Sequence, residues 1–172
     1  MLTRMGIRFR VIPSRYQERF LQGHSPAMLA MRHAVGKAKK ALLPKRARFV
    51  MSADTVVVCK EQILGKPKDR KKAYQMISFL SGRTNSVITA VALWDRREGV
   101  LLAETACSQV FIKKLSPKER RNYIRRSHPY DKAGGYAIQG GPRIARRLSG
   151  SYSNIVGFPR ELVRKMLKQV GY

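Results

Sequence analysis

Acidic residues are scarce in this sequence, whose 172 residues include 10 Asp and Glu against 36 Lys and Arg, for a formal net charge of +26. An excess of this size predicts attraction to polyanions such as nucleic acid, acidic membrane surfaces or nucleotide phosphates. The basic residues recur in nearly every polar stretch, whereas a dedicated nucleic-acid reader concentrates them on one face. Composition alone therefore leaves two explanations of the charge open. The protein either binds a polyanionic partner, or it reflects a generally basic proteome or an unusual ionic environment.

Cysteine, histidine and long apolar runs are also in short supply. The two cysteines, Cys59 and Cys107, fall in separate strand-like runs, which predicts reduced, buried thiols rather than a disulfide framework. The three histidines lack ligand spacing with each other or with cysteine, which argues against a zinc site. No apolar run approaches the roughly eighteen residues of a membrane span, and no hydrophobic signal segment follows Met1. We therefore expect a cytoplasmic protein with no membrane partner.

The rest of the composition is ordinary for a globular chain, with 44% hydrophobic residues and a length that suits one domain spanning residues 1–172. Ser25-Pro26, Asp69 and Ser116-Pro117 are typical helix starts. Apolar periodicity predicts strands and helices in alternation, and hence a single α/β domain. The predicted strands cover residues 7–12, 49–58, 86–94, 100–112 and 144–148, and the predicted helices cover residues 27–43, 70–80, 117–125 and 160–170.

One strand carries an acid in its interior. Residues 49–58 are rich in apolar and β-branched side chains, yet Asp54 lies within this run and is followed by the hydroxyl of Thr55. A buried carboxylate is costly unless something pairs with it or coordinates it. About ten residues later, Gly65-Lys66-Pro67 supplies a turn that carries a lysine. Together these groups would suit a phosphate bound with its metal ion. A strand with an incidental edge Asp, followed by a hairpin, is the alternative.

Two later stretches are rich in glycine and poor in bulky side chains. They cover residues 131–141 and 150–159, and the second also carries several hydroxyl groups. Glycine lets a backbone approach a ligand closely or adopt a positive φ. We therefore expect both stretches to be loops beside a ligand or another close-packed segment.

Taken in order, these pieces resemble the Maf family of nucleoside triphosphate pyrophosphatases. Any single short block of matching residues is weak evidence for the resemblance. The whole series, however, occurs in the same order and register as in the family and covers nearly the entire chain. The blocks are Pro13-Ser14 with Glu18, Lys37-Ala38, Ala53-Asp54-Thr55, Ile63-Leu-Gly-Lys-Pro67, Leu80-Ser-Gly-Arg83, Asp131-Lys-Ala-Gly134 with Tyr136, Ile138-Gln-Gly140, and Gly150-Ser-Tyr-Ser-Asn154 with Val156-Gly157 and Pro159.

The resemblance implies a fold and a reaction. The fold is α/β, a single domain with an elongated mixed β-sheet and flanking helices, and two lobes around a cleft as in inosine triphosphatases. The reaction cleaves a nucleoside triphosphate to the monophosphate and pyrophosphate with a divalent metal cation, Mg²⁺ or Mn²⁺. Members of the family are often homodimers. The Ala53-Asp54-Thr55 block is similar to the subgroup that acts on dTTP and UTP.

The resemblance also implies roles for individual residues. Asp54 matches the general base, and with Glu18 it would suffice to hold the metal, since Mg²⁺ prefers one or two carboxylates with phosphate oxygens and water. Thr55 and Gln139 match positions associated with the choice of base. A glutamine amide can both donate to and accept from a pyrimidine edge.

Lysines complete the implied site. Lys37 and Lys66, together with Glu18, match polar groups at the phosphate end of the cleft, where lysines offset the charge of the triphosphate and the leaving pyrophosphate. Lys132 is either a phosphate contact or a solvated charge, and Asp131 either acts in the site or fixes Lys132 or the glycine-rich loop.

The chain departs from the family at its start. Maf proteins open with a short strand and a Ser-x-Ser-Pro-Arg-Arg loop whose arginines grip the triphosphate, and the sequence begins just after that point, at Met1-Leu2. Three explanations compete: the start codon is placed too far downstream, the chain is truncated and inactive, or the general basicity of the chain replaces the arginines of that loop. Positioned donors outperform a diffuse field, so the last is the weakest explanation.

Three rival hypotheses about function follow. The chain is either an active pyrimidine nucleotide pyrophosphatase or a catalytically impaired homologue. A basic nucleic-acid-binding protein on the same scaffold is the third hypothesis, motivated by the net charge. Its aromatic residues are few and scattered, without the pattern of a base-stacking platform.

Overall fold

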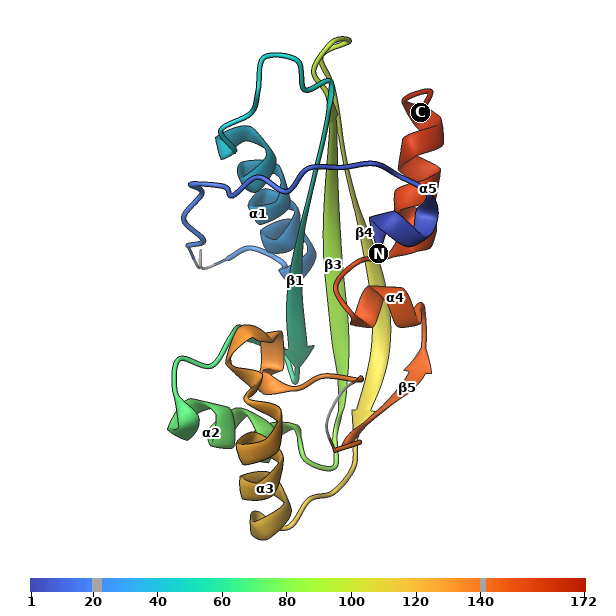
Figure 1. The fold of residues 1–172 in the computed structure, drawn as a ribbon. Helices are drawn as coiled ribbons and strands as arrows, with labels where there is room; N and C mark the ends of the chain where they lie inside the picture. Colours follow the sequence, from blue (N-terminus) through green and yellow to red (C-terminus); the bar gives the residue numbers. More distant parts are fainter. Residues whose placement is uncertain (20–22, 140–141) are drawn as a thin grey trace.

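The computed structural model describes residues 1–19, 23–139 and 142–172. One five-stranded sheet forms its centre, in the order β2-β1-β3-β4-β5. The strands are β1 (Phe49–Cys59), β2 (Gln62–Leu64), β3 (Thr84–Asp95), β4 (Val100–Ile112) and β5 (Ala145–Ser149). Figure 1 shows β1, β3 and β4 as long strands that run through both halves of the molecule.

The helices follow the predicted alternation. The main ones are α1 (Pro26–Lys40), α2 (Arg70–Leu80), α3 (Pro117–Ser127) and α5 (Arg160–Gln169). The short α4 (Tyr152–Ile155) and three 3₁₀ turns, η1 (Leu2–Met5), η2 (Pro129–Asp131) and η3 (Ala133–Gly135), lie in the connections. None of the helices in the described ranges has both the length and the apolar character needed to cross a membrane.

The predicted helix starts are confirmed by their caps. The Ser25 hydroxyl accepts a hydrogen bond from the Met28 amide at 3.3 Å, and the Asp69 carboxylate accepts one from the Lys72 amide at 2.7 Å. At α3, Ser116 begins a capping box in which its own amide donates to the Glu119 carboxylate at 2.8 Å. These bonds satisfy backbone amides that a helix start leaves without partners.

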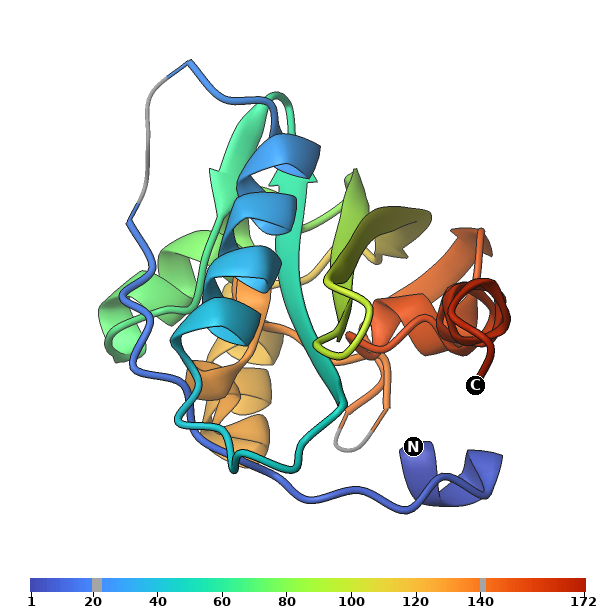
Figure 2. The same ribbon diagram turned by 90° about the horizontal axis from the view of Figure 1, so that it is seen from above.

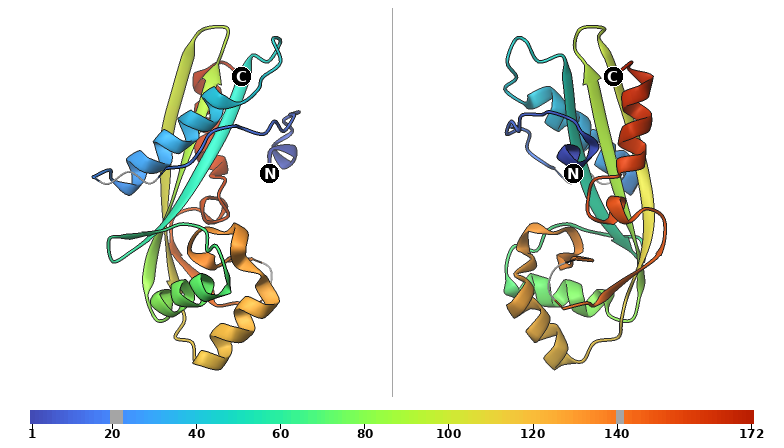
Figure 3. Two further views of the ribbon diagram at one scale, coloured as in Figure 1. Left: turned by 90° about the vertical axis from the view of Figure 1, so that its left-hand side faces the viewer. Right: turned by 45° about the vertical axis from the view of Figure 1, so that its right-hand side comes forward.

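The sheet separates the helices into two groups. Neighbouring residues of a strand point to opposite faces, and in β3 Ala90 and Ala92 pack under α1 while Val91 and Leu93 pack under α5. Figure 2 shows α1 and α5 on opposite sides of the sheet. In Figure 3, α2 and α3 form a lower lobe on the side opposite α1. Helix α1 therefore covers one face of the sheet, whereas α5 and the lower lobe of α2 and α3 cover the other.

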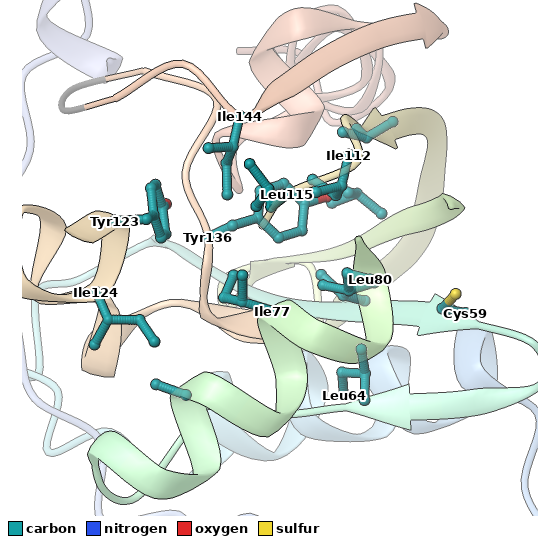
Figure 4. Packing of buried hydrophobic residues seen from close by; sticks show 14 residues of the cluster. Cys59, Leu64, Ile77, Leu80, Ile112, Leu115, Tyr123, Ile124, Tyr136 and Ile144 are labelled. Atoms are coloured by element: carbon teal, nitrogen blue, oxygen red, sulfur yellow. The ribbon is translucent and has the colours of Figure 1, made fainter. Parts of the chain in front are cut away.

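The lower lobe has its own core, built from α2, α3 and the glycine-rich segment before β5 (Figure 4). Ile77 of α2 is fully buried there. Tyr136 is buried too, and its hydroxyl donates to Asn85 Oδ1 at 2.6 Å, while the Asn85 side-chain amide donates to the Val110 carbonyl at 3.1 Å. The Tyr123 hydroxyl accepts from the Ala137 amide at 3.0 Å. These bonds fix the glycine-rich segment to the sheet and α3.

Two expectations about the sheet are wrong. The resemblance implied a mixed sheet, but every strand pair in the described residues is antiparallel. Residues 7–12, predicted as a strand, form none, and Figure 1 shows them crossing the direction of β1. Alternating apolar residues make a strand only beside a ladder partner, and Val11 stays 79% exposed.

The cysteine prediction is half right. Cys59 is buried in β1, its thiol points at the Thr84 carbonyl, and burial raises its pKa. Cys107 is exposed. In β4 every second residue from Ser108 is buried, at Ser108, Val110 and Ile112. Neighbouring residues of a strand point to opposite faces, so Cys107 points to the other face. Both thiols are free.

Replacing Ile77 by alanine should destabilise the lower lobe. The side chain is fully buried, and such truncations lower the free energy of unfolding by about 2–5 kcal/mol because they leave a cavity. Leu42→Ala is the control, since Leu42 is 61% exposed and its truncation should change that free energy by less than about 0.5 kcal/mol. Urea unfolding compares the two. Equal losses would contradict the packing described for this lobe.

Candidate active site

A cleft of about 1100 Å³ opens between the lobes, across the outer edge of β1. In the described residues this edge has a strand partner only at Val57–Cys59, where β2 pairs with it. The cleft therefore reaches both faces of β1. All the site residues predicted from the sequence line it, namely Glu18, Lys37, Asp54, Thr55, Lys66, Lys132 and Gln139.

Asp54 lies at the centre of the upper wall. It is 8% exposed and points toward α1, whose Lys37 donates to Asp54 Oδ1 at 2.6 Å. His33 of the same helix lies on its other side, with Nδ1 3.3 Å from Asp54 Oδ2. Residues four apart share one helix face, so His33 and Lys37 flank the carboxylate together. The cost of burying Asp54 is offset by the bond from the Lys37 ammonium group.

Glu18 joins the same group from the segment before α1. Its Oε1 lies 2.7 Å from Lys37 Nζ, so one ammonium group bridges two carboxylates. The hydrogen bond from Lys37 lowers the pKa of Glu18. Burial alone would lower the pKa of Lys37, but its bonds to Asp54 and Glu18 outweigh burial and raise it. Glu18 and Lys37 are therefore both charged near neutral pH.

The segment that carries Glu18 is held against α1 by several contacts. Ser14 forms a bridge with Ala41, and the Arg15 amide donates to the Lys40 carbonyl at 3.3 Å. The Tyr16 ring lies over α1 where Gly36 leaves room for it, and a Cβ at Gly36 would overlap the ring. A glycine in the middle of a helix lowers helix stability by about 1 kcal/mol. Here the absence of a side chain at Gly36 provides the space that the Tyr16 ring occupies.

Lys66 and Lys132 face the site from the lower lobe. Their loops are joined by the hydrogen bond from the Gly134 amide to the Gly65 carbonyl, at 3.0 Å. Lys132 Nζ lies 2.8 Å from Asp131 Oδ1, and this bond lowers the pKa of Asp131. Asp131 therefore holds Lys132. Neither lysine contacts the carboxylates of the upper wall in the interactions described, and both border open space in the cleft.

Thr55 and Gln139 lie farther along the cleft. The Thr55 and Thr89 hydroxyls are 3.0 Å apart, and Thr89 also lies 3.2 Å from the Asn154 carbonyl. Gln139 is exposed, and its Oε1 accepts from the Tyr152 hydroxyl at 3.3 Å. Both residues line the cleft, where they present a hydroxyl and an amide group.

The last glycine-rich loop closes this end. Asn154 is fully buried, and its side-chain amide donates to the Val87 carbonyl at 3.0 Å and to the Ser108 hydroxyl at 2.8 Å. Gly157 has φ +91°, and a Cβ there would lie 3.2 Å from the Thr55 hydroxyl. Asn154 thus supports the loop, and Gly157 lets it approach Thr55.

His33 is the residue that sequence reasoning missed. The histidines were judged by their spacing to each other, whereas His33 acts with Glu18 and Asp54, which are distant in sequence. Its position four residues before Lys37 was the available signal. Glu18, His33 and Asp54 each offer a ligand atom, and these atoms lie within 4.8 Å of one another, a donor set that suits a divalent cation.

The model of the family described as Maf-like protein matches residues 1–170. The chain belongs to the Maf-like protein family. A Geobacter sp. (strain M21) protein named dTTP/UTP pyrophosphatase is 41% identical to this Maf-like chain over 172 residues, which cover 99% of the chain and 89% of that protein.

Other relatives carry the same name. Those of Citrifermentans bemidjiense and Syntrophomonas wolfei are 40% and 38% identical to this Maf-like chain over 172 residues. Each match covers 99% of the chain, and 89% and 91% of the respective relatives. The family resemblance drawn from the sequence blocks is thus confirmed over nearly the whole length.

Gly36→Ala tests how Glu18 is held. The new methyl group would overlap the Tyr16 ring, so the usual helix gain of up to about 1 kcal/mol should be lost. In a Tyr16→Ala background the ring is absent, and the same change should stabilise the protein by about 0.5–1 kcal/mol. Unfolding free energies of the four proteins give this cycle. Equal stabilisation in both backgrounds would show that Tyr16 does not pack on Gly36.

Proposed function

We propose that this chain hydrolyses nucleoside triphosphates, dTTP and UTP above all, to the monophosphate and pyrophosphate. The observation that carries the proposal is the buried Asp54, held between Lys37 and His33 in a cleft lined with further lysines. The relatives named dTTP/UTP pyrophosphatase support the choice of substrate.

Asp54 is the general base of the proposed reaction. Hydrolysis at the α-phosphorus requires a water made nucleophilic, and a fixed carboxylate can orient that water and accept its proton. Lys37 holds Asp54 Oδ1, so the orientation of the carboxylate is fixed before substrate arrives. A Mg²⁺ or Mn²⁺ ion held by Asp54 and Glu18 would supply charge neutralisation at the phosphates.

The triphosphate lies in this proposal between the two lobes. Lys66 and Lys132 face the cleft from loops joined to each other, where they offset the charge of the leaving pyrophosphate. Thr55 and Gln139 select the base from the other end of the cleft. A pyrimidine edge matches a hydroxyl and an amide that both donate and accept.

The proposal extends to partners and compartment. We infer a homodimer, as the family resemblance implies, and the cytoplasm, where the nucleotide pool is available. We also infer a sequence-independent affinity for nucleic acid, supported by the net charge of +26 and by exposed arginines on α3 such as Arg121, Arg125 and Arg126. This affinity is secondary, because the basic residues are spread over both lobes rather than gathered on one binding face.

Asp54→Asn should reduce pyrophosphate release from dTTP and UTP by about 10²–10⁴-fold, the usual contribution of a general base. The assay runs over the common nucleoside triphosphates with Mg²⁺ or Mn²⁺. Asp69→Asn is the matched control, because it removes the same charge outside the cleft and asparagine still caps α2. Its rate should equal that of the unmodified chain.

Two results would count against the assignment. Unchanged release in Asp54→Asn would show that another group activates the water. A folded, unmodified chain that releases no pyrophosphate from any nucleotide would instead be a catalytically impaired homologue.

Nucleic-acid binding should show a steep dependence on salt. Each phosphate neutralised by Lys or Arg releases counterions, so affinity for a random duplex should fall at least about tenfold between roughly 50 and 200 mM salt. Fluorescence anisotropy with two unrelated duplexes measures this and should give equal affinities. Binding that barely responds to salt would refute a charge-driven interaction.

A further inference from the structure

His33 is a buried titratable group of the upper wall to which the proposed reaction gives no role. It is 4% exposed, its Nδ1 lies 3.3 Å from Asp54 Oδ2, and its Nε2 lies 3.2 Å from the Arg19 carbonyl oxygen. The ring also packs at a tilt against Tyr16, with the centroids 5.8 Å apart. A histidine held on three sides has one fixed orientation, with Nδ1 aimed at the carboxylate.

The backbone contact determines which ring nitrogen carries hydrogen. A carbonyl oxygen only accepts, so Nε2 must be the donor toward Arg19. In the neutral ring Nδ1 then carries a lone pair, and it faces another acceptor, the Asp54 carboxylate oxygen. Two acceptors at this distance repel each other unless a cation or a proton lies beside them.

We propose that His33 is a third protein ligand, through Nδ1, of a divalent cation also held by Asp54 and Glu18, and that it shifts the site toward transition metals and away from Mg²⁺. The three ligand atoms lie within 4.8 Å of one another. Imidazole nitrogen favours transition metals, whereas Mg²⁺ prefers oxygen ligands alone. This inference shares its site with the proposed hydrolysis but does not depend on which nucleotide is cleaved.

The second ring nitrogen supports the assignment. Histidines that bind metals almost always donate their other N–H to a carbonyl or carboxylate, which fixes the tautomer and the ring. The Nε2–H bond to Arg19 is such a contact. It comes from the same segment that carries Glu18, so one stretch of chain both supplies a ligand and orients another.

Lys37 leaves room for this ion. It contacts Asp54 Oδ1 and Glu18 Oε1, and each carboxylate has a second oxygen. The second oxygen of Asp54 is the one that faces His33. Ligand and ammonium thus use different atoms of Asp54, and the remaining positions on the cation are left to water and phosphate oxygens.

Electron spin echo spectroscopy of Mn²⁺ bound to the untagged full chain, without nucleotide, tests the proposal directly. A coordinated imidazole gives a nitrogen modulation, which should disappear in His33→Leu. Labelling with ¹⁵N-histidine leaves the sequence unchanged and should convert the ¹⁴N pattern to the ¹⁵N pattern. His128→Asn removes an exposed histidine on α3's end, where asparagine tolerates the left-handed backbone, and should retain the modulation.

Metal affinity gives the second readout. Loss of the nitrogen ligand should weaken Mn²⁺ binding by about tenfold or more, while Mg²⁺ affinity, measured by competition, changes by less than about threefold. Leucine is apolar and of similar size, so the buried position should still fold, as circular dichroism checks. Absence of nitrogen modulation in the unmodified chain, its persistence in His33→Leu, or an equal loss of affinity for both metals would overturn the assignment.

The outcomes separate this inference from the proposed function. Nitrogen modulation without pyrophosphate release would refute the hydrolase and leave His33 as a metal ligand. Release of pyrophosphate without nitrogen modulation would refute only the ligand role.

Discussion

The contact between Lys37 and Asp54 is the interaction on which the cleft depends. A carboxylate that is only 8% exposed requires a partner, and removing one member of a buried pair typically costs about 3–5 kcal/mol. The partner lies on α1. The need to pair one buried carboxylate of β1 therefore fixes how α1 is rotated about its axis and where it lies along β1. Glu18 binds the same ammonium group and joins the preceding segment to this arrangement.

The shared strands then determine the shape of the site. Strands β1 and β3 continue from one lobe into the other, so the lobes cannot separate without breaking the sheet. Asp54 and Val57, for example, lie on the same strand but in different lobes. The outer edge of β1 lies between the lobes with few strand partners in the described residues. Backbone there is reachable from both faces, which lets groups from α1 and from the glycine-rich loop meet around one ligand.

Much of this was predictable from sequence where the signal is local. Helix α2 covers the predicted residues 70–80 and begins where Asp69 caps it, and β4 covers the predicted residues 100–112. The prediction was wrong for residues 7–12, since a strand depends on a partner that those residues do not carry themselves. His33 was missed for the same reason, because its role arises only when α1 packs on β1 and brings Asp54 to it.

The net charge bears on selectivity more than on affinity. Most of the ten acidic side chains are engaged, as helix caps at Asp69 and Glu119, in ion pairs at Asp95, Glu104 and Asp131, or in the cleft at Glu18 and Asp54. The rest of the surface therefore attracts any triphosphate, and such a field speeds encounter without distinguishing one base from another. Discrimination must come from groups with fixed direction and no net charge. In the proposed site these are the Thr55 hydroxyl, oriented by Thr89, and the Gln139 amide beside Tyr152.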